Sequence, residues 1–161
     1  MARIIQGIIA GAALTLAGIA IGAASAPRTQ TSAVLFDHTA IHVADQQKSI
    51  DFYQGLFHFA EIPSPFPPGG PRWLVMGNGI ELHIQPGRRQ AITSPRQVHF
   101  AVTVPDLAPI LAWLRAHQVA WVDSADRPGQ ISRTRSDGVQ QIFLQDPDGY
   151  WIEINDVKRL A

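Results

Sequence analysis

The chain contains an internal repeat. The octet from His38 to Asp45 (HTAIHVAD) returns as the octet from His99 to Asp106 (HFAVTVPD), with histidine, alanine, an aliphatic residue, valine and aspartate in the same register. A recurrence of this kind indicates one supersecondary unit that is used twice. The two histidines should then occupy pseudo-symmetric places, and paired histidines suggest a shared metal site.

The composition limits the class of protein. The chain has 161 residues and a hydrophobic content of 46%, which is enough for one globular body or for two small halves that share a core. Its 13 basic residues balance 13 acidic ones, so the net charge does not favour nucleic acid or an anionic membrane surface as a partner. Cysteine is absent, so any metal must be bound by His, Asp or Glu.

Residues 1–26 have the pattern of an export signal. Arg3 gives a short positive start, residues 4–24 are almost wholly apolar, and Ala24 and Ala26 frame a small-x-small cleavage site. We therefore expect the folded part of the chain to lie outside the cytoplasm, either released into the periplasm or anchored to the membrane.

A retained membrane anchor is the open alternative to cleavage. Proline is unfavourable directly after a cleavage site, and Pro27 stands there. About 20 apolar residues would also span roughly 30 Å of hydrocarbon, so residues 4–24 could stay in the membrane. Residues 27–36 are polar and contain proline, and we expect a linker there.

Hydrophobic patterning predicts two similar modules, residues 37–86 and 98–156, within one domain at residues 37–156. Each begins with an alternating strand, and an aspartate then caps a helix. Two strand, helix, three-strand units should pair their sheets, because either alone would leave one sheet face open to water. We predict an α+β fold of two paired modules, with a cleft bounded by both sheets. The later strands are expected at residues 72–76, 80–84, 120–122, 139–144 and 150–154.

Three residues form the centre of the predicted site. His38 and His99 begin the two repeated strands and can both point into the cleft, and Glu153 offers a carboxylate from the last strand. Two imidazoles and one carboxylate suit a divalent ion such as Fe²⁺, Mn²⁺, Zn²⁺, Ni²⁺ or Co²⁺, with positions left open for substrate or water. We predict a divalent metal cofactor on these side chains.

A fourth ligand should come from the hairpin of the first module. Laying residues 79–83 against residues 149–153 pairs His83 with Glu153. Glu81 would face the same side of its strand, so a slip of one pleat would replace the imidazole by a carboxylate. We predict His83 and keep Glu81 as the alternative. Glu81 and Glu153 are also the candidates for moving protons.

Other polar residues have weaker claims on the site. Arg72, Arg133 and Arg135 could bind an anionic substrate group, because guanidinium forks grip carboxylates and phosphates, although solvated surface charge is the commoner explanation. His42 pairs with Thr103 in the repeat, so a packing or supporting role is expected for it.

Taken together, these residues resemble the vicinal oxygen chelate superfamily, which includes glyoxalases, bleomycin resistance proteins and extradiol dioxygenases. The resemblance rests on residues 36–45, 49–53, 73–74, 80–84, 99–102 and 143–153. It implies two βαβββ modules around a divalent metal, with His38, His99 and Glu153 at ligand positions and His83 or Glu81 at the fourth. One departure is His58, where the turn after the helix often has glycine, so backbone strain is expected there.

The resemblance does not specify the reaction, because members of this superfamily catalyse several chemistries or only bind drugs. We expect a metal-dependent enzyme that acts on a small oxygen-chelating substrate as a lyase, isomerase or dioxygenase. The alternative is a small-molecule sequestering protein of the bleomycin-resistance type. Export would separate the chain from the cytosolic thiol pool, which argues against a glutathione-dependent reaction.

Exchange of modules between two chains would give a homodimer.

Overall fold

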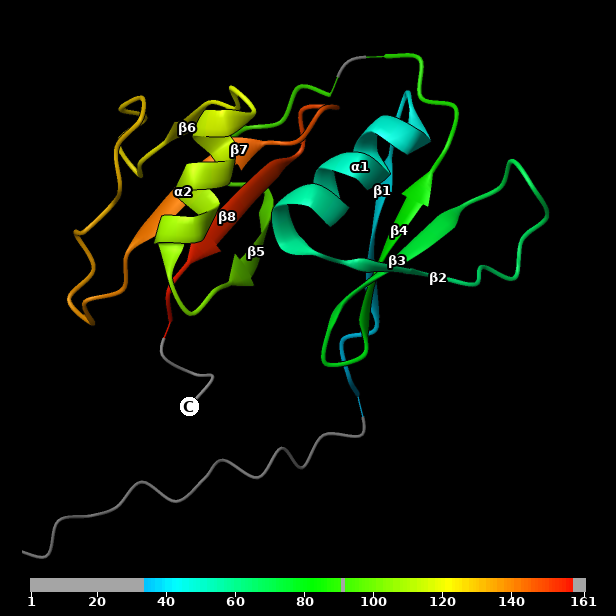
Figure 1. Cartoon of the computed structure of the whole chain (residues 1–161), viewed down its shortest axis with the longest axis horizontal. Coiled ribbons are helices and arrows are strands. Elements are labelled where there is room, and N and C mark those ends of the chain that lie inside the picture. The colour runs from blue at the N-terminus through cyan, green and yellow to red at the C-terminus, as the bar shows by residue number, and fades with distance from the viewer. Residues whose placement is uncertain (1–33, 91, 158–161) are drawn as a thin grey trace, which may run out of the picture. The chain divides into compact units, whose positions relative to one another are not determined.

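The computed structural model describes residues 34–90 and 92–157 (Figure 1). The signal or anchor predicted at residues 1–26 lies outside the described residues. No helix in the described part of the chain has the length and apolar character needed to cross a membrane.

The first module has the predicted strand, helix and three strands. Its elements are β1 (His38–His42), α1 (Gln46–Phe57), β2 (Ala60–Ile62), β3 (Arg72–Gly77) and β4 (Ile80–Gln85). They form a sheet of order β1-β4-β3-β2, in which only the β1–β4 pair is parallel. Asp45 caps α1 by accepting a hydrogen bond from the backbone N–H of Lys48 at 3.1 Å. The helix ends at His58, whose φ of 58° confirms the expected left-handed backbone.

The second module repeats this topology. It contains β5 (His99–Thr103), α2 (Leu107–Ala116), β6 (Trp121–Val122), β7 (Gln141–Gln145) and β8 (Trp151–Asn155), in the sheet order β5-β8-β7-β6. Asp106 caps α2 through the backbone N–H of Ala108 at 2.9 Å. The predicted α+β fold of two βαβββ modules is therefore confirmed.

The strand register is also the same in the two modules. In the β1–β4 pair, Ala40 lies opposite His83, and in the β5–β8 pair Ala101 lies opposite Glu153. Each alanine is two residues after the histidine that opens its strand. His83 and Glu153 consequently occupy equivalent positions, as the alignment of the two hairpins predicted.

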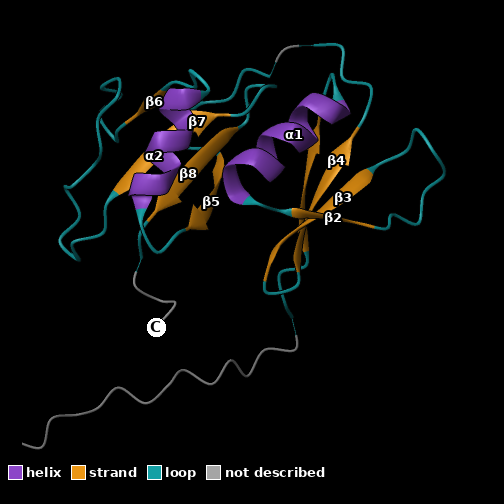
Figure 2. Cartoon of the chain, viewed as in Figure 1, coloured by secondary structure: helices purple, strands orange, loops and turns teal. Residues whose placement is uncertain are grey.

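Both helices and one face of each sheet bury a single hydrophobic core (Figure 2). The two helices contact each other, and the ring of Phe52 on α1 meets the ring of Trp113 on α2 edge-on at 5.9 Å. Burial alternates along β1, where Ile41 faces this core while His38 and His42 are exposed. The histidine-bearing face of each sheet is therefore turned away from the core that the modules share.

The turn between β7 and β8 joins the second module to the first. Asp148 in this turn accepts hydrogen bonds from the backbone N–H of Ala44 at 2.8 Å and from the hydroxyl of Ser49 at 3.0 Å, and it forms an ion pair with Arg88. The Asp148 carboxylate therefore holds the two modules together.

Asp146 in the same turn makes a second contact between the two modules. Its carboxylate accepts a hydrogen bond from the Tyr53 hydroxyl of α1 at 2.8 Å. Burial raises the pKa of Asp146, and burial together with the neighbouring charge of Asp146 raises the pKa of Tyr53 well above its usual value. Further along, the Tyr150 hydroxyl accepts a hydrogen bond from the backbone N–H of His42 at 2.9 Å.

Candidate functional site

The residues predicted as metal ligands fall into two clusters, one on each sheet. His38, Glu81 and His83 lie on the outward face of β1 and β4, and His99 and Glu153 lie on the outward face of β5 and β8. Among the described residues, no group of three or more His, Asp or Glu side chains is arranged to hold a metal ion. Each cluster is therefore described by itself.

The first cluster is a stack of rings. The imidazoles of His38 and His83 are 4.1 Å apart and inclined by 12°, and the Trp73 ring stacks on His83 at 4.2 Å with an inclination of 6°. Since β4 lies between β1 and β3, the His83 ring lies between the other two. His83 Nε2 is 2.8 Å from Glu81 Oε2, so the two alternative fourth ligands contact each other.

Asp37 orients the exposed member of this stack. His38 Nδ1 lies 2.7 Å from Asp37 Oδ2. A carboxylate oxygen only accepts hydrogen bonds, so Nδ1 carries the proton and Nε2 presents its lone pair. This is the arrangement that a ligating histidine needs.

The second cluster is a close pair. His99 Nε2 is 3.3 Å from Glu153 Oε2, and the two side chains are 25% and 13% exposed. His99 Nδ1 lies 2.7 Å from the backbone carbonyl of Arg96, which again places the proton on Nδ1 and the lone pair on Nε2. The other Glu153 oxygen, Oε1, accepts a hydrogen bond from the side-chain amide of Asn155 at 2.8 Å.

The second cluster fits two adjacent positions of a metal shell. Two ligand atoms at about 2.1 Å from one ion, separated by tetrahedral or octahedral angles, are about 3.0 to 3.4 Å apart. The measured His99–Glu153 separation of 3.3 Å lies in this range. Among the described residues, therefore, neither cluster by itself is arranged as a complete metal site.

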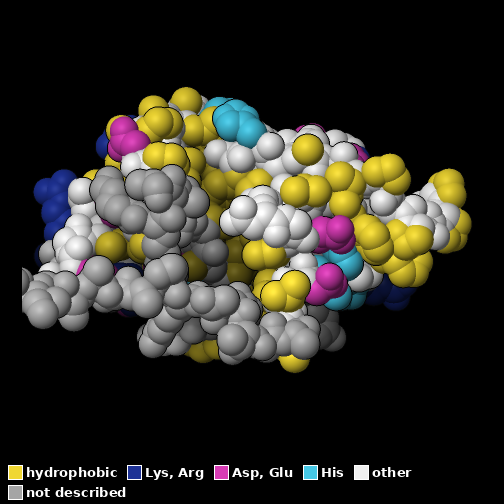
Figure 3. All heavy atoms as spheres, turned by 90° about the horizontal axis from the view of Figure 1, so that it is seen from below, with side chains coloured by type: hydrophobic (Ala, Val, Ile, Leu, Met, Phe, Trp, Pro, Cys, Tyr) yellow, Lys and Arg dark blue, Asp and Glu magenta, His cyan; other side chains and the backbone are white. Residues whose placement is uncertain are grey.

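The predicted cleft exists, but the predicted ligands do not line it. A groove of about 1040 Å³ opens between the modules, and residues such as Leu56, Phe100, Thr103 and Trp113 line it. The modules join through the faces covered by their helices, because this arrangement buries the apolar surfaces of both helices at once. Figure 3 shows histidine and acidic side chains gathered in a separate patch on the side of the β1-β4-β3-β2 sheet.

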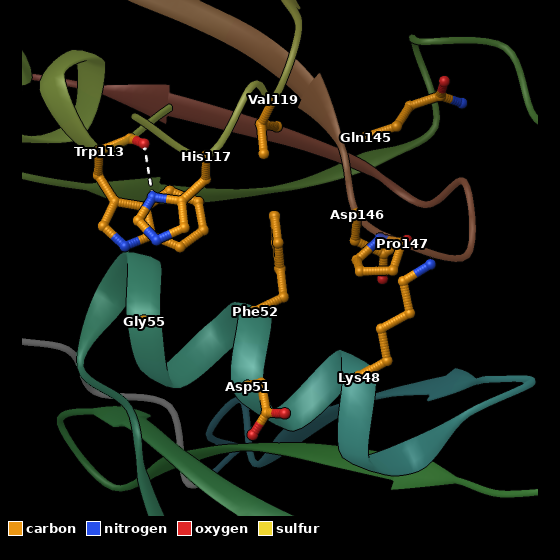
Figure 4. Close-up of a pocket in the computed structure, with 10 residues that line it drawn as sticks. All are labelled: Lys48, Asp51, Phe52, Gly55, Trp113, His117, Val119, Gln145, Asp146 and Pro147. Atoms are coloured by element: carbon orange, nitrogen blue, oxygen red, sulfur yellow. Dashed lines mark hydrogen bonds between the residues drawn. The ribbon is translucent and has the colours of Figure 1, made fainter. Parts of the chain in front are cut away.

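A second cavity lies between the two helices (Figure 4). Its volume is about 520 Å³, and side chains from α1, α2 and the β7–β8 turn line it. Phe52 points into it, and the rings of Trp113 and His117 stack at one side, 3.9 Å apart. No residue predicted for the metal site lines this cavity.

Arg72 and Arg133, two of the three arginines suggested for substrate binding, already donate hydrogen bonds to side chains of the same chain. Arg72 holds both oxygens of Glu61 at 2.6 and 2.7 Å, and this hydrogen-bonded pair raises the pKa of Arg72 and lowers that of Glu61. Arg133 donates from Nε to the side-chain oxygen of Gln140 at 3.0 Å. A role for these side chains in substrate binding stays a prediction.

Arg135 is the suggested arginine with an electrostatic link to the second cluster. It pairs with Asp137 at 2.6 Å. The hydrogen bonds that Arg135 donates to Asp137 raise the pKa of Arg135, and the negative charge of Glu153 adds a smaller contribution in the same direction. Arg135 is consequently the best placed of the three to meet an anionic group near Glu153.

Sequence reasoning missed several supporting residues. Asn155 could have been found, because it lies two residues after Glu153 and therefore on the same face of its strand. Arg96 and Trp73 act through local contacts that no motif marks: the Arg96 carbonyl lies three residues before His99, and Trp73 lies directly opposite His83 in the β3–β4 hairpin. His42 is exposed, and its Nε2 lies 3.0 Å from the carbonyl of Pro86.

Comparison with known proteins gives a consistent picture. Residues 35–154 match the model of the Glyoxalase/Bleomycin resistance protein/Dioxygenase superfamily. A lactoylglutathione lyase of Pseudomonas putida is 26% identical in an alignment of 158 positions that covers 77% of this chain and 86% of that protein. The structure of oxidase ChaP-H2 is 25% identical, with a TM-score of 0.65 over 81% of this chain and 98% of that one. The fosfomycin resistance protein FosX of Listeria monocytogenes is 18% identical, with a TM-score of 0.60 over 78% and 95%, which is a likeness of fold alone.

Proposed function

The chain belongs to the Glyoxalase/Bleomycin resistance protein/Dioxygenase superfamily, and from that premise we propose that it is a divalent-metal-dependent enzyme acting on a small substrate with two neighbouring oxygens. The reaction class is that of a lyase, an isomerase or a dioxygenase. Relatives named as a lyase and as an oxidase support this range.

The His99–Glu153 pair is the observation that carries the proposal. Its Nε2 and Oε2 atoms are 3.3 Å apart, and the hydrogen bond from His99 Nδ1 to Arg96 leaves Nε2 with a lone pair. His38 has the same tautomer because of Asp37. A structural histidine that only cross-links strands does not require this matched orientation in both repeats.

The metal, when bound, would polarise a substrate oxygen as a Lewis acid. The protein's side chains would then bind the substrate, orient it and exchange protons with it. Glu81, whose Oε2 lies 2.8 Å from His83 Nε2, is placed to accept a proton from the substrate. Trp73 covers the His83 ring and shields it from water on that side, and Arg135 would bind an anionic substrate group.

The complete site is proposed to form between two copies of the chain. The two partial ligand sets lie on the outward faces of different sheets, so a second copy can set its His99 and Glu153 against His38 and His83 of the first. A two-fold axis would make two such sites per dimer. Glu81 stays the alternative to His83 in this arrangement.

A titration of the full-length protein with Co²⁺ tests the proposal. We expect about one equivalent of metal per chain, and a dimer by light scattering. His99→Ala should abolish stoichiometric uptake, while His58→Ala, at the end of α1, should leave it intact. Uptake below about a tenth of an equivalent by the wild-type protein would contradict the proposal.

The alternative function is capture of a small molecule without catalysis. The groove of about 1040 Å³ between the modules favours it, because its volume and largely apolar lining suit a small organic ligand. Ligand binding by a wild-type protein that takes up no metal would support this alternative over the enzyme.

A further inference from the structure

The side chains of Thr103, Asn155 and Glu153 are linked by two successive hydrogen bonds, which we call the relay. The Thr103 hydroxyl donates to Asn155 Oδ1 at 3.0 Å, and the Asn155 amide donates to Glu153 Oε1 at 2.8 Å. The strand register produces the relay, because Thr103 on β5 lies directly opposite Asn155 on β8. Asn155 is only 6% exposed, so water competes little for its hydrogen bonds.

The partners of Asn155 fix the orientation of its amide. Oδ1 receives the Thr103 hydroxyl and, at 3.4 Å, the backbone N–H of Val157. The NH₂ group must then face Glu153, whose carboxylate can only accept. With Oε1 engaged in this way, Oε2 is the oxygen directed to His99, at 3.3 Å from Nε2.

We propose that Asn155 and Thr103 are positioning residues, which hold Glu153 so that Oε2 and His99 Nε2 can bind one metal ion. This inference rests on the proposed function. A glutamate side chain has several rotatable bonds. If it were free to move before the metal binds, its immobilisation would cost free energy at the moment of binding. The bond from Asn155 is charge-assisted and therefore strong enough to select one rotamer.

The equivalent positions of the first module do not form a relay of this kind. The register places His42 where the second module has Thr103, and Gln85 where it has Asn155. His42 instead lies against the carbonyl of Pro86. The relay through Thr103 and Asn155 therefore belongs to the second module, and its loss should affect Glu153 without disturbing the ring stack on the first sheet.

Metal affinity of the full chain tests the relay. In Thr103→Val the hydroxyl is lost with little change of shape, and in Asn155→Leu the amide is lost. Both should weaken Co²⁺ binding by about 10- to 100-fold and alter the visible spectrum of the bound ion. Thr103→Ser keeps the hydroxyl and should restore binding close to the wild-type value. Thr39→Val is the matched control, because Thr39 lies on the other face of the equivalent strand of the first module.

The outcomes separate the relay from the proposed function. Wild-type protein that binds no Co²⁺ would overturn both. Wild-type binding together with unchanged affinity in Thr103→Val and Asn155→Leu would overturn the relay alone. A thermal melt without metal controls for folding: a Thr103→Val protein that melts like the wild type but binds metal weakly supports a positioning role. If Asn155→Leu does not fold, the comparison of Val with Ser at position 103 decides.

Discussion

Asp148 accepts a hydrogen bond from the Ser49 hydroxyl at 3.0 Å across the boundary between the two modules. Ser49 lies in the first turns of α1, and Asp148 lies in the turn that leads into β8, so this contact joins the two helix-covered halves directly. The same carboxylate pairs with Arg88 from the segment after β4. Asp148 thus contributes contacts that hold the first and second modules together.

Loss of this carboxylate should destabilise the fold strongly. Asp148→Ala leaves Arg88, whose side chain is 12% exposed, without its partner. Removing one member of a buried ion pair costs about 3 to 5 kcal/mol of unfolding free energy. Urea unfolding measures the loss. Asp137→Ala is the control, because the pair that Asp137 forms with Arg135 is exposed to solvent and should contribute little to stability. Equal losses in the two variants would show that Asp148 is not a structural tie.

The contribution of Asp148 should also depend on pH. Burial alone would raise the pKa of Asp148, but hydrogen bonds from Arg88, Ala44 and Ser49 outweigh it and lower the pKa. A lowered folded-state pKa gives stability that is present above the unfolded value of about 3.9 and lost as the pH falls toward the folded value. The difference in unfolding free energy between the wild type and Asp148→Asn should therefore be full at pH 7 and shrink below about pH 4. A constant difference between pH 7 and pH 3 would refute this assignment.

Both helices end in a left-handed residue that is not glycine. His58 after α1 has a φ of 58°, and Gln118 after α2 has a φ of 55°. Glycine adopts this conformation without a steric penalty, so His58→Gly and Gln118→Gly should each gain about 0.5 to 1 kcal/mol of stability. Thermal unfolding measures the gain. Gln54→Gly, inside α1, should instead lose about 1 kcal/mol, and a loss at all three positions would contradict the idea of strain.

Local patterns were sufficient to predict the modules. The alternation around His38 and His99, and the capping aspartates Asp45 and Asp106, each act over a few residues, and the structure places strands and helices there. The equivalence of His83 with Glu153 followed from the same local register.

The arrangement of the modules could not be predicted in this way. It depends on contacts between segments far apart in the chain, such as Tyr53 with Asp146 and Ser49 with Asp148, and no period in the sequence records them. The assumption that both repeated histidines point into one cleft of the same chain therefore failed, although the residues were assigned to the expected strands. In the same way, only the fold shows what the carboxylates of Asp146 and Asp148 contact.

Gly55 on α1 makes room for the indole of Trp113 on α2, and this contact gives the last prediction. A Cβ atom at position 55 would lie 3.0 Å from Trp113 Cζ2. Gly55→Ala should be close to neutral, because about 1 kcal/mol of helix propensity offsets the tight contact. Gly55→Val should push the indole toward the cavity between the helices and lose about 1 to 3 kcal/mol. Urea unfolding and near-ultraviolet circular dichroism of the displaced tryptophan measure both effects, and a Val variant as stable as the Ala variant would show that the two helices can move apart freely.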